Sequence, residues 1–303
     1  MSIIIGKLDC ISDQRGTALK GCLNTLNQIS KFILIQRGTK LNLQTDTLDI
    51  SKVTDLIQSG KMVVLPNLDS MEAQTEDYTY ETLGSGVKIP VRAGLYEWLA
   101  NYRGVFCLSK SINQLVSRAW DLWLVDIDNK LAVEVTADGF IKGFECSLVN
   151  GENITFNDGS TSSKKPMRIQ LSPSGTRAFN ERSDTIADGI DFVNLDGVED
   201  VYLNILSNKV ASLNIAVVDG CDKTTVIEGL DATKYWKITN ASTGSAVTPT
   251  SITFADGAYK FAGLTAGDYL FQLYDSAKSR PIVVVGTGFY KTTGATSVTI
   301  TAS

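Results

Sequence analysis

The stretch DLWLVDIDNKLAVEVTADGFIKGFECSLV, from Asp121 to Val149, decides the fold class of this chain. Apolar and polar residues alternate along it with a period of two, which is the pattern of β-strands. Polar turns at Asp128–Asn129 and Asp138–Gly139 divide it into three runs. The stretch therefore predicts an antiparallel meander, and with it a mainly β fold.

Two helices are expected before this meander. The first is capped by Ser51 and runs to about Gln58, where Gly60 ends it. The second begins at Ser109 and extends to about residue 119, with a single apolar stripe. A helix docked on a β-sheet explains that stripe.

Further strands are expected on both sides of the meander. KFILIQ (31–36) and MRIQLS (167–172) read as strands, and the segment 173–189 after the second reads as turn-rich. With the helices and the meander, these strands indicate an N-terminal antiparallel β domain over residues 1–207.

The composition changes near Asn208, where Thr, Ala, Gly and Ser become frequent and charges rare. Short strand patterns then recur at regular spacing, as in an immunoglobulin-like β-sandwich. The corner FAGLTAGDYLFQLYD (261–275) resembles the L-x-x-G-x-Y corner of small Ig-like sandwiches. Residues 208–303 are therefore predicted to form a separate Ig-like domain. Its expected strands are ASLNIAVVD, KYWKIT, SITFA, AYKFAG, DYLFQLYD, PIVVVGT and TSVTIT.

Charge and residue content exclude several classes of function. The formal net charge of -5 and the absence of a basic run argue against a protein that coats nucleic acid. The chain has no histidine, which removes Ser-His-Asp and Cys-His catalysis and histidine-ligated metals. The apolar run at the N-terminus is too short for a signal peptide or a membrane span. No catalytic residue, cofactor or metal site is expected.

The cysteines form an odd and scattered set without a C-x-x-C pair, and we expect reduced thiols. Cys107 lies at a helix entry, where a thiol can become reactive. Because no histidine is present to act as its base, a buried structural thiol is the favoured interpretation. The five cysteines are Cys10, Cys22, Cys107, Cys146 and Cys221.

Carboxylates offer two weaker hypotheses. Asp126 and Asp128 suggest a calcium loop, but the spacing lacks the glycine and the distal acidic ligand of an EF-hand, so a hairpin turn is favoured. Glu97, Asp121 and Glu134 could supply a glycosidase-like pair, although nothing in the sequence brings two of them together.

Aromatic residues of the C-terminal domain suggest a surface-binding face for carbohydrate. The candidates are Tyr235, Trp236 and Tyr259. Strand alternation places Tyr235 and Trp236 on opposite faces, so one of them is expected in the core.

The segment TYETLGSGVKIPVRAGLYEWL (79–99) allows two interpretations. Its glycines and nearby cations could cradle an anion. It also reads as an exposed hairpin, in which Gly84-Ser85-Gly86 joins two strands and Pro90 removes a ladder donor, as suits an edge or a protruding arm.

These features together resemble the tail tube proteins of long-tailed bacteriophages, in particular phages of Bacteroidetes-type hosts. The resemblance rests on YETLGSGVKIPVRAG, the helix SKSINQLVSRA leading into WLVDIDNK, the exit TADGFIKGFECSLV, the later MRIQLS and the appended Ig-like domain. It covers roughly residues 1–207 in order of elements. The region from Lys31 to Asp77 is longer than the minimal tube fold requires.

The resemblance implies a β-sandwich or barrel-like tube domain with a flanking helix, which forms hexameric rings that stack into a tube. A hairpin from each subunit reaches the neighbouring ring, DNA passes through the lumen without specific binding, and the Ig-like domain decorates the outside. The implied partners are further copies of the chain and other tail proteins, in a virion tail assembled in the host cytoplasm, with no membrane. Interface candidates are Tyr80, Glu81, Thr82, Gly84, Gly86, Lys88, Pro90 and Arg92.

Two alternatives stay open at this point. One is another phage ring or decoration protein, at the neck, baseplate or capsid. The other is a carbohydrate- or host-surface-binding module that acts through the Ig-like domain.

Overall fold

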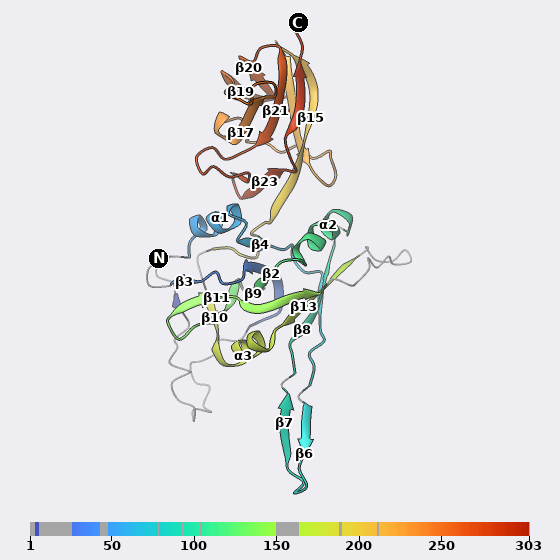
Figure 1. The fold of residues 1–303 in the computed structure, drawn as a ribbon, viewed down its shortest axis with the longest axis vertical. Helices are drawn as coiled ribbons and strands as arrows, with labels where there is room; N and C mark the ends of the chain where they lie inside the picture. Colours follow the sequence, from blue (N-terminus) through green and yellow to red (C-terminus); the bar gives the residue numbers. More distant parts are fainter. Residues whose placement is uncertain are drawn as a thin grey trace. The chain divides into compact units, whose positions relative to one another are not determined.

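The computed structural model describes residues 4–5, 26–42, 48–77, 79–92, 94–103, 105–149, 164–187, 190–210 and 212–302. The fold is mainly β, as the sequence predicts. The chain forms two compact units, Met1–Leu195 and Asp196–Ser303 (Figure 1). The second unit begins before the predicted boundary at Asn208, because β15 (Val198–Lys209) pairs with strands of that unit.

The N-terminal unit is built on one large antiparallel sheet. Strand order is β1-β14-β10-β9-β12-β13-β8-β5, while β2 takes the other edge of β9, and β4 pairs with β2. The elements are β1 Ile4–Ile5, β2 Ile29–Gln36, β3 Leu41–Asn42, α1 Ile50–Gln58, β4 Met62–Val64, β5 Ser70–Ala73, β6 Thr79–Thr82, β7 Lys88–Arg92, β8 Glu97–Tyr102, α2 Val105–Leu115, β9 Trp120–Asp126, β10 Lys130–Val135, β11 Phe140–Lys142, β12 Phe144–Val149, β13 Lys165–Leu171, α3 Pro173–Arg182 and β14 Ser183–Ala187.

This sheet curls until its two sides meet along the segment from β4 to β5. β4 pairs with β2, and Leu68 N still donates to Ser30 O (2.8 Å). The next residue, Asp69, donates instead to Asn101 O (2.9 Å), and β5 continues on β8. One stretch of chain thus closes the ring β2-β9-β12-β13-β8, which agrees with the predicted barrel-like domain.

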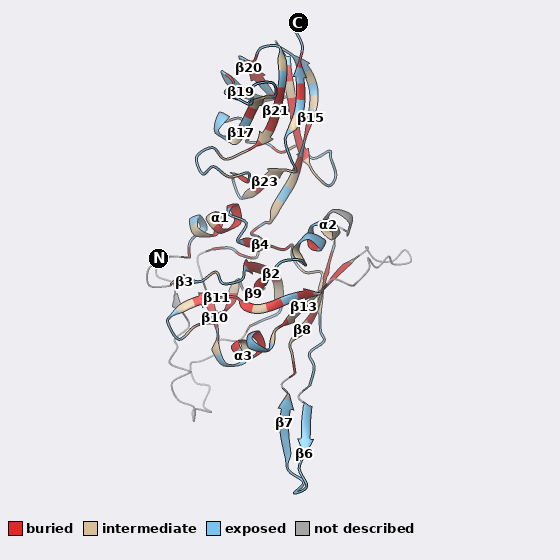
Figure 2. Ribbon diagram, in the orientation of Figure 1, coloured by how far each residue is buried: buried red, intermediate tan, exposed pale blue. Residues whose placement is uncertain are grey.

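The interior of this barrel holds a continuous apolar core. Strands β2, β8, β9, β12 and β13 each contribute alternate residues to it, and α2 and α3 contribute Ile112 and Ala178 (Figure 2). The aromatic rings of Trp98 and Phe179 pack edge to face, with centroids 6.1 Å apart. Burial of this apolar surface is the main source of stability for the unit.

The predicted meander is correct for both of its hairpins, since β10 also pairs with β11 around the turn at Asp138–Gly139. Only the second half of its last run departs from the prediction. β9 and β10 pair around the turn at Asp128, as expected. The run 140–149 is two strands, because the chain breaks at Gly143. β12 then returns to pair with β9, beside Leu122, instead of extending the meander. A Cβ atom at Gly143 would lie 2.7 Å from Asp121 Cβ, so only glycine allows this close crossing.

The two predicted helices exist with shifted ends. α1 begins after Asp49, whose carboxylate accepts a hydrogen bond from Lys52 N (2.8 Å), so Asp49 and not Ser51 is the cap. α2 spans Val105–Leu115 and therefore starts and ends earlier than the predicted 109–119. The indole of Trp120 donates to Leu115 O (2.9 Å) and satisfies a carbonyl at the helix end.

The segment predicted as turn-rich contains a helix and a strand. Ser172 accepts a hydrogen bond from Gly175 N (3.0 Å) and Pro173 occupies the first turn, so α3 has a regular N-terminus. The strand β14 follows directly and pairs with β10. The Ser-Pro pair was the signal in the sequence, but the polar content of the segment obscured it.

The C-terminal unit is a sandwich of two sheets with a shared core, as predicted. Strand orders are β19-β20-β16-β15-β23-β22 and β18-β17-β21-β24, and all seven predicted strands are present. Tyr269, the tyrosine of the corner motif, is buried and its hydroxyl lies 3.1 Å from Thr265 Oγ1. The remaining elements are β16 Ser212–Asp219, the 3-10 turn η2 Thr233–Tyr235, β17 Trp236–Asn240, β18 Ala246–Val247, β19 Ser251–Ala255, β20 Ala258–Ala262, β21 Gly267–Leu273, β22 Val283–Val285, β23 Gly288–Thr292 and β24 Thr296–Ile300.

Candidate functional site

Residues 79–92 form a two-stranded hairpin, here called the arm, that belongs to neither large sheet. Within the described part of the chain, β6 and β7 pair only with each other (Figure 1). The tip is a tight turn in which Leu83 N donates to Val87 O (2.9 Å) and Gly86 N to Leu83 O (2.8 Å). Gly86 has φ +80°, a conformation that favours glycine. The exposed-hairpin interpretation of this segment is therefore confirmed.

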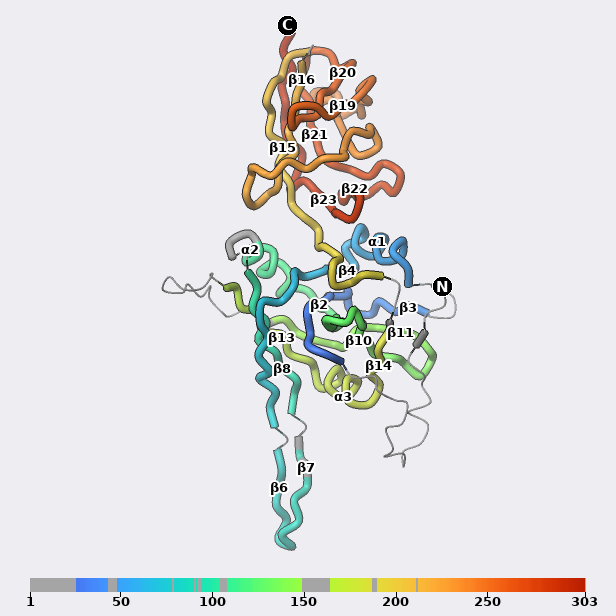
Figure 3. The backbone as a smooth tube through the Cα atoms, turned by 180° about the vertical axis from the view of Figure 1, so that it is seen from behind, coloured from blue at the N-terminus to red at the C-terminus, as the bar shows by residue number. Residues whose placement is uncertain are grey.

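The arm is the continuation of strands β5 and β8. Beyond β5, Gln74 N donates to Glu97 O (2.8 Å) and Glu76 N to Leu95 O (3.2 Å). Backbone hydrogen bonds therefore extend the β5–β8 ladder as far as Glu76 and Leu95, in the direction of the arm (Figure 3). At Gly94 the two strands come so close that a Cβ atom would overlap Glu76 O. Glycine at this position is required by the close approach.

One face of the arm is largely polar. Residues directly opposite in an antiparallel pair share a face, and here Tyr80 faces Pro90 and Thr82 faces Lys88. The ring of Tyr80 is 55% exposed. Six of the eight predicted interface residues therefore lie within one short ladder, and the other two, Gly84 and Gly86, lie at its turn.

The other face of the arm is apolar. Glu81 faces Ile89 across the ladder, and Leu83 and Val87 follow as the next pair on that face. Ile89, Leu83 and Val87 are 43%, 42% and 56% exposed (Figure 2). Glu81 makes no ion pair within the described part of the chain.

The sequence interpretation named charged, polar and turn residues of the arm as interface candidates and did not include these apolar residues. Strand alternation shows which residues share a face, but it does not show whether another layer covers that face. Val91, which is 61% exposed beside the bulge near Tyr80, was missed for the same reason. Of the predicted candidates, the side chains of Pro90 and Arg92 lie outside the described residues.

The predicted aromatic binding face of the C-terminal unit is wrong for two of its three residues. Trp236 and Tyr259 are 6% and 0% exposed and belong to the core. The Trp236 indole donates to Leu230 O (2.7 Å), and the Tyr259 hydroxyl donates to Ile227 O (2.7 Å). Both side chains are held by core hydrogen bonds. Tyr235 is half-buried, with Lys234 Nζ 4.9 Å from its ring centre.

The carboxylates weighed as a catalytic pair each have their own cationic partners. Glu97 bonds to Arg168 and Gln170. Glu134 is buried between Lys142 and Arg182, at 3.1 and 2.8 Å.

Asp121, the third of these carboxylates, is buried beside Arg37 at 3.4 Å. Burial raises the pKa of Asp121, while the N–H of Gly38 and the charge of Arg37 act in the opposite direction.

Asp126 organises a turn, as the hairpin interpretation predicted. One carboxylate oxygen accepts from the N–H groups of Asp128 (2.9 Å) and Lys130 (2.8 Å), and the other accepts from Asn27 N (3.1 Å). Among the described residues, no group of three or more acidic or cysteine side chains is placed to hold a metal ion.

The cysteines differ in oxidation state. Cys146 is a buried free thiol, and burial raises its pKa to about 12. Cys221 is disulfide-bonded, so the expectation of reduced thiols is wrong for this residue. Spacing along a chain does not determine distance in space, which is why the scattered pattern misled. The side chain of Cys107 lies outside the described residues.

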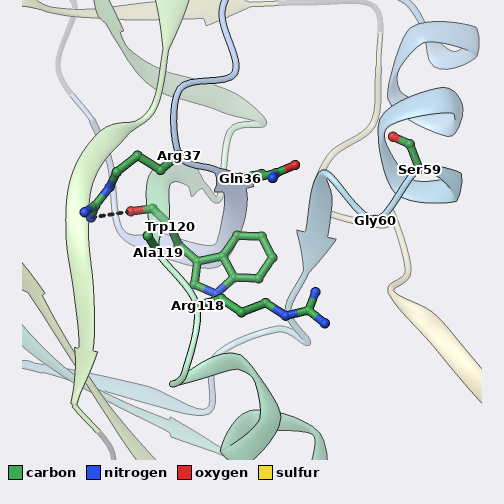
Figure 4. A pocket seen from close by; sticks show the side chains of 7 residues that line it. All are labelled: Gln36, Arg37, Ser59, Gly60, Arg118, Ala119 and Trp120. Carbon is green, nitrogen blue, oxygen red and sulfur yellow. Dashed lines mark hydrogen bonds between the residues drawn. The ribbon is translucent and has the colours of Figure 1, made fainter.

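A cavity of about 550 Å³ lies in the N-terminal unit (Figure 4). Its lining comes from three segments: the end of β2, the end of α1, and the link between α2 and β9. Arg118 extends along the edge of the Trp120 indole, and its guanidinium points away from that of Arg37 (Figure 4). The lining residues are Gln36, Arg37, Ser59, Gly60, Arg118, Ala119 and Trp120.

The two arginines of this cavity differ in their pairing. Arg37 bonds to Asp121, Glu145 and two backbone carbonyls, so its charge is already compensated. Arg118 is exposed and forms no ion pair with any described residue. The cavity therefore presents one uncompensated positive charge beside the exposed Ala119, with the buried Trp120 behind it.

Comparison with known proteins does not assign this chain to a family. No model of a known protein family matches the chain, and no curated protein sequence matches it either. Within the described residues, none of the helices has the length and apolar content needed to cross a membrane.

Proposed function

We propose that this protein is a structural subunit of a virus particle, the tail tube subunit of a long-tailed bacteriophage, which polymerises as stacked rings around a channel for DNA. The observation that carries the proposal is the arm. A surface hairpin with a row of exposed apolar residues is the kind of feature that marks a protein–protein contact.

The low stability expected of an isolated arm favours contact with a partner. A two-stranded hairpin without a covering layer is marginally stable in water. The arm has two strands and packs none of its described side chains into a core. Covering Leu83, Val87 and Ile89 would contribute about 25 cal/mol for each Å² of apolar surface removed from water. Assembly would thus stabilise both the contact and the arm itself.

Other properties of the chain support this proposal. The barrel and the sandwich each have their own core, so the C-terminal unit can decorate an assembly that the N-terminal unit makes. The acidic net charge of -5 suits a protein whose channel must release DNA, because binding to phosphates requires clustered cations. Hexameric rings and a place in the virion tail, reached after assembly in the host cytoplasm, form part of the proposal.

Electron microscopy of the purified protein tests the proposal directly. The full chain is expected to form rings or tubes in negative stain. A variant in which residues 79–92 are replaced by an Asn-Gly turn should stay folded and remain monomeric, since Asn-Gly closes a hairpin on its own. Ile127→Ser serves as the matched control, because Ile127 is 53% exposed but lies outside the arm.

Two results would count against the proposal. One is a full chain that stays monomeric at every concentration tested. The other is an arm-replaced variant that still forms long tubes, since the arm would then not be the assembly element. Rings without tubes from the full chain would instead favour the neck, baseplate or capsid alternatives.

The carbohydrate-binding alternative has lost its main support. It depended on an aromatic face, and two of the three residues that defined that face are part of the core.

A further inference from the structure

We infer that the cavity beside Arg118 receives the arm of a second copy of this chain, with Glu81 of the arm paired to Arg118 and Leu83 seated against Ala119. This inference rests on the proposed function and names the surface on which the arm docks.

Charge complementarity is the first argument. Glu81 and Arg118 are both exposed, and neither makes an ion pair within the described residues. Glu81 lies on the apolar face of the arm, next to the Leu83–Val87 pair at the tip. Arg118 likewise lies beside apolar surface, contributed by the exposed Ala119, while the buried Trp120 closes the cavity behind it. Each site therefore offers one charge together with apolar surface, and the two charges have opposite sign.

The position of the two sites within the N-terminal unit is the second argument. β8 leads to the arm at its Glu97 end and to α2 at its Tyr102 end. The cavity residues Arg118–Trp120 follow α2, and both views place α1 and α2 at the end of the barrel away from β6 and β7 (Figures 1 and 3). Arm and cavity therefore lie at opposite ends of the same unit.

A contact between opposite ends has a geometric consequence. Because the two surfaces differ, each copy can offer an arm to one neighbour and a cavity to another, which is a heterologous contact. Two copies joined in this way still have one unoccupied arm and one unoccupied cavity. Such contacts continue in one direction, as stacked rings require.

The size of the cavity is the third argument. A volume of about 550 Å³ lies in the range of small-ligand sites. It suits the few side chains of a hairpin tip and is too small for a folded domain. The turn Leu83–Val87 is the part of the arm that matches it.

A charge exchange tests the pairing. Glu81→Arg and Arg118→Glu are each expected to raise the concentration needed for assembly about tenfold or more, because like charges then face each other. The double variant should assemble near the wild-type concentration. Asp138→Arg, a charge reversal at an exposed turn outside both the arm and the cavity, is the matched control and should change assembly little.

Cross-linking tests the placement separately. Leu83→Cys combined with Ser59→Cys should give disulfide-linked chains on oxidation, whereas each single variant should give far fewer. Both positions avoid the buried core, and thermal unfolding of every variant checks that it is folded.

The outcomes separate this inference from the function. If the full chain assembles, the arm-replaced variant does not, and Arg118→Glu assembles normally without the cross-link, the arm docks elsewhere and the inference fails alone. If both single charge variants fail, the double variant is not restored and no cross-link forms, the inference also fails. A full chain that never assembles overturns both.

Discussion

Gly175 occupies a position that has no room for a side chain. A Cβ atom there would lie 2.1 Å from Glu145 O, because the first turn of α3 presses against β12. The N–H of Ser172 donates to the same oxygen (2.9 Å) and fixes the helix to the strand. The contact therefore constrains both the helix start and the packing of α3 on the barrel.

Replacement of Gly175 by alanine should lower the free energy of unfolding by about 2–3 kcal/mol, because α3 must move away from β12 to relieve the overlap. Urea unfolding followed by far-UV circular dichroism measures this change. Gly84→Ala is the control, since Gly84 has open space around it, and it should change stability by less than about 0.5 kcal/mol. Equal stability of the two variants would contradict the assigned contact.

At the scale of elements, Trp236 shows how β17 is anchored in the sandwich. Its ring packs edge to face on Phe261 with centroids 4.9 Å apart, and it lies 5.7 Å from the ring of Tyr259. Its indole N–H donates a hydrogen bond to Leu230 O. Trp236 is therefore a central packing residue and not part of a binding face.

Trp236→Ala should destabilise the C-terminal unit by about 3–5 kcal/mol, the usual cost of removing a large buried aromatic side chain. Tyr235→Ala, at the neighbouring half-buried position, should cost clearly less. Thermal unfolding and near-UV circular dichroism of the full chain distinguish the two. A Trp236→Ala variant with the stability of Tyr235→Ala would show that the ring is not part of the core.

The sequence predicted strands well where period-two patterns ended at clear turns, as in all seven strands of the C-terminal unit. It predicted helix existence better than helix ends, because Asp49 and Ser51 are both good caps and only the hydrogen bond to Lys52 N decides between them. It failed at α3, where Ser172 and Pro173 signalled a helix inside a polar segment. The pairing of β12 with β9 depends on the crossing at Gly143, which local pattern does not encode.

The position of the hairpin could be predicted from the sequence, but the exposure of its apolar residues could not. The glycine turn and Pro90 indicated a hairpin over the correct residues. Exposure of Leu83, Val87 and Ile89 depends on the absence of a covering layer in the N-terminal unit, which is a tertiary property. The cavity joins three segments distant in sequence, so no motif could reveal it.

At the scale of the whole molecule, the boundary between the two units has a testable consequence. β15 lies inside the larger sheet of the C-terminal unit, paired with β16 on one side and with β23 on the other. Its residues Val201 and Leu203 are part of the core. The predicted boundary at Asn208 would remove almost all of this strand.

Fragment 196–303 should therefore fold on its own, whereas fragment 208–303 should not. The shorter fragment lacks a central strand and leaves the edges of β16 and β23 open. Amide proton dispersion in NMR spectra of the two fragments makes the comparison. A well-dispersed spectrum from 208–303 would place the boundary where the sequence alone suggested it.

The segment from β4 to β5 both closes the barrel and leads into the arm, so it also determines how a mechanical load would enter the N-terminal unit. Backbone hydrogen bonds in a sheet lie perpendicular to the strands. A pull along the arm would act parallel to β5 and β8. It would load the hydrogen bonds between these two strands simultaneously, in shear. β13 pairs with the other edge of β8 and supports it. Breaking such a ladder requires many bonds to fail at once, whereas peeling a strand sideways breaks them one by one. The N-terminal unit is thus built to resist tension along the direction in which its arm extends.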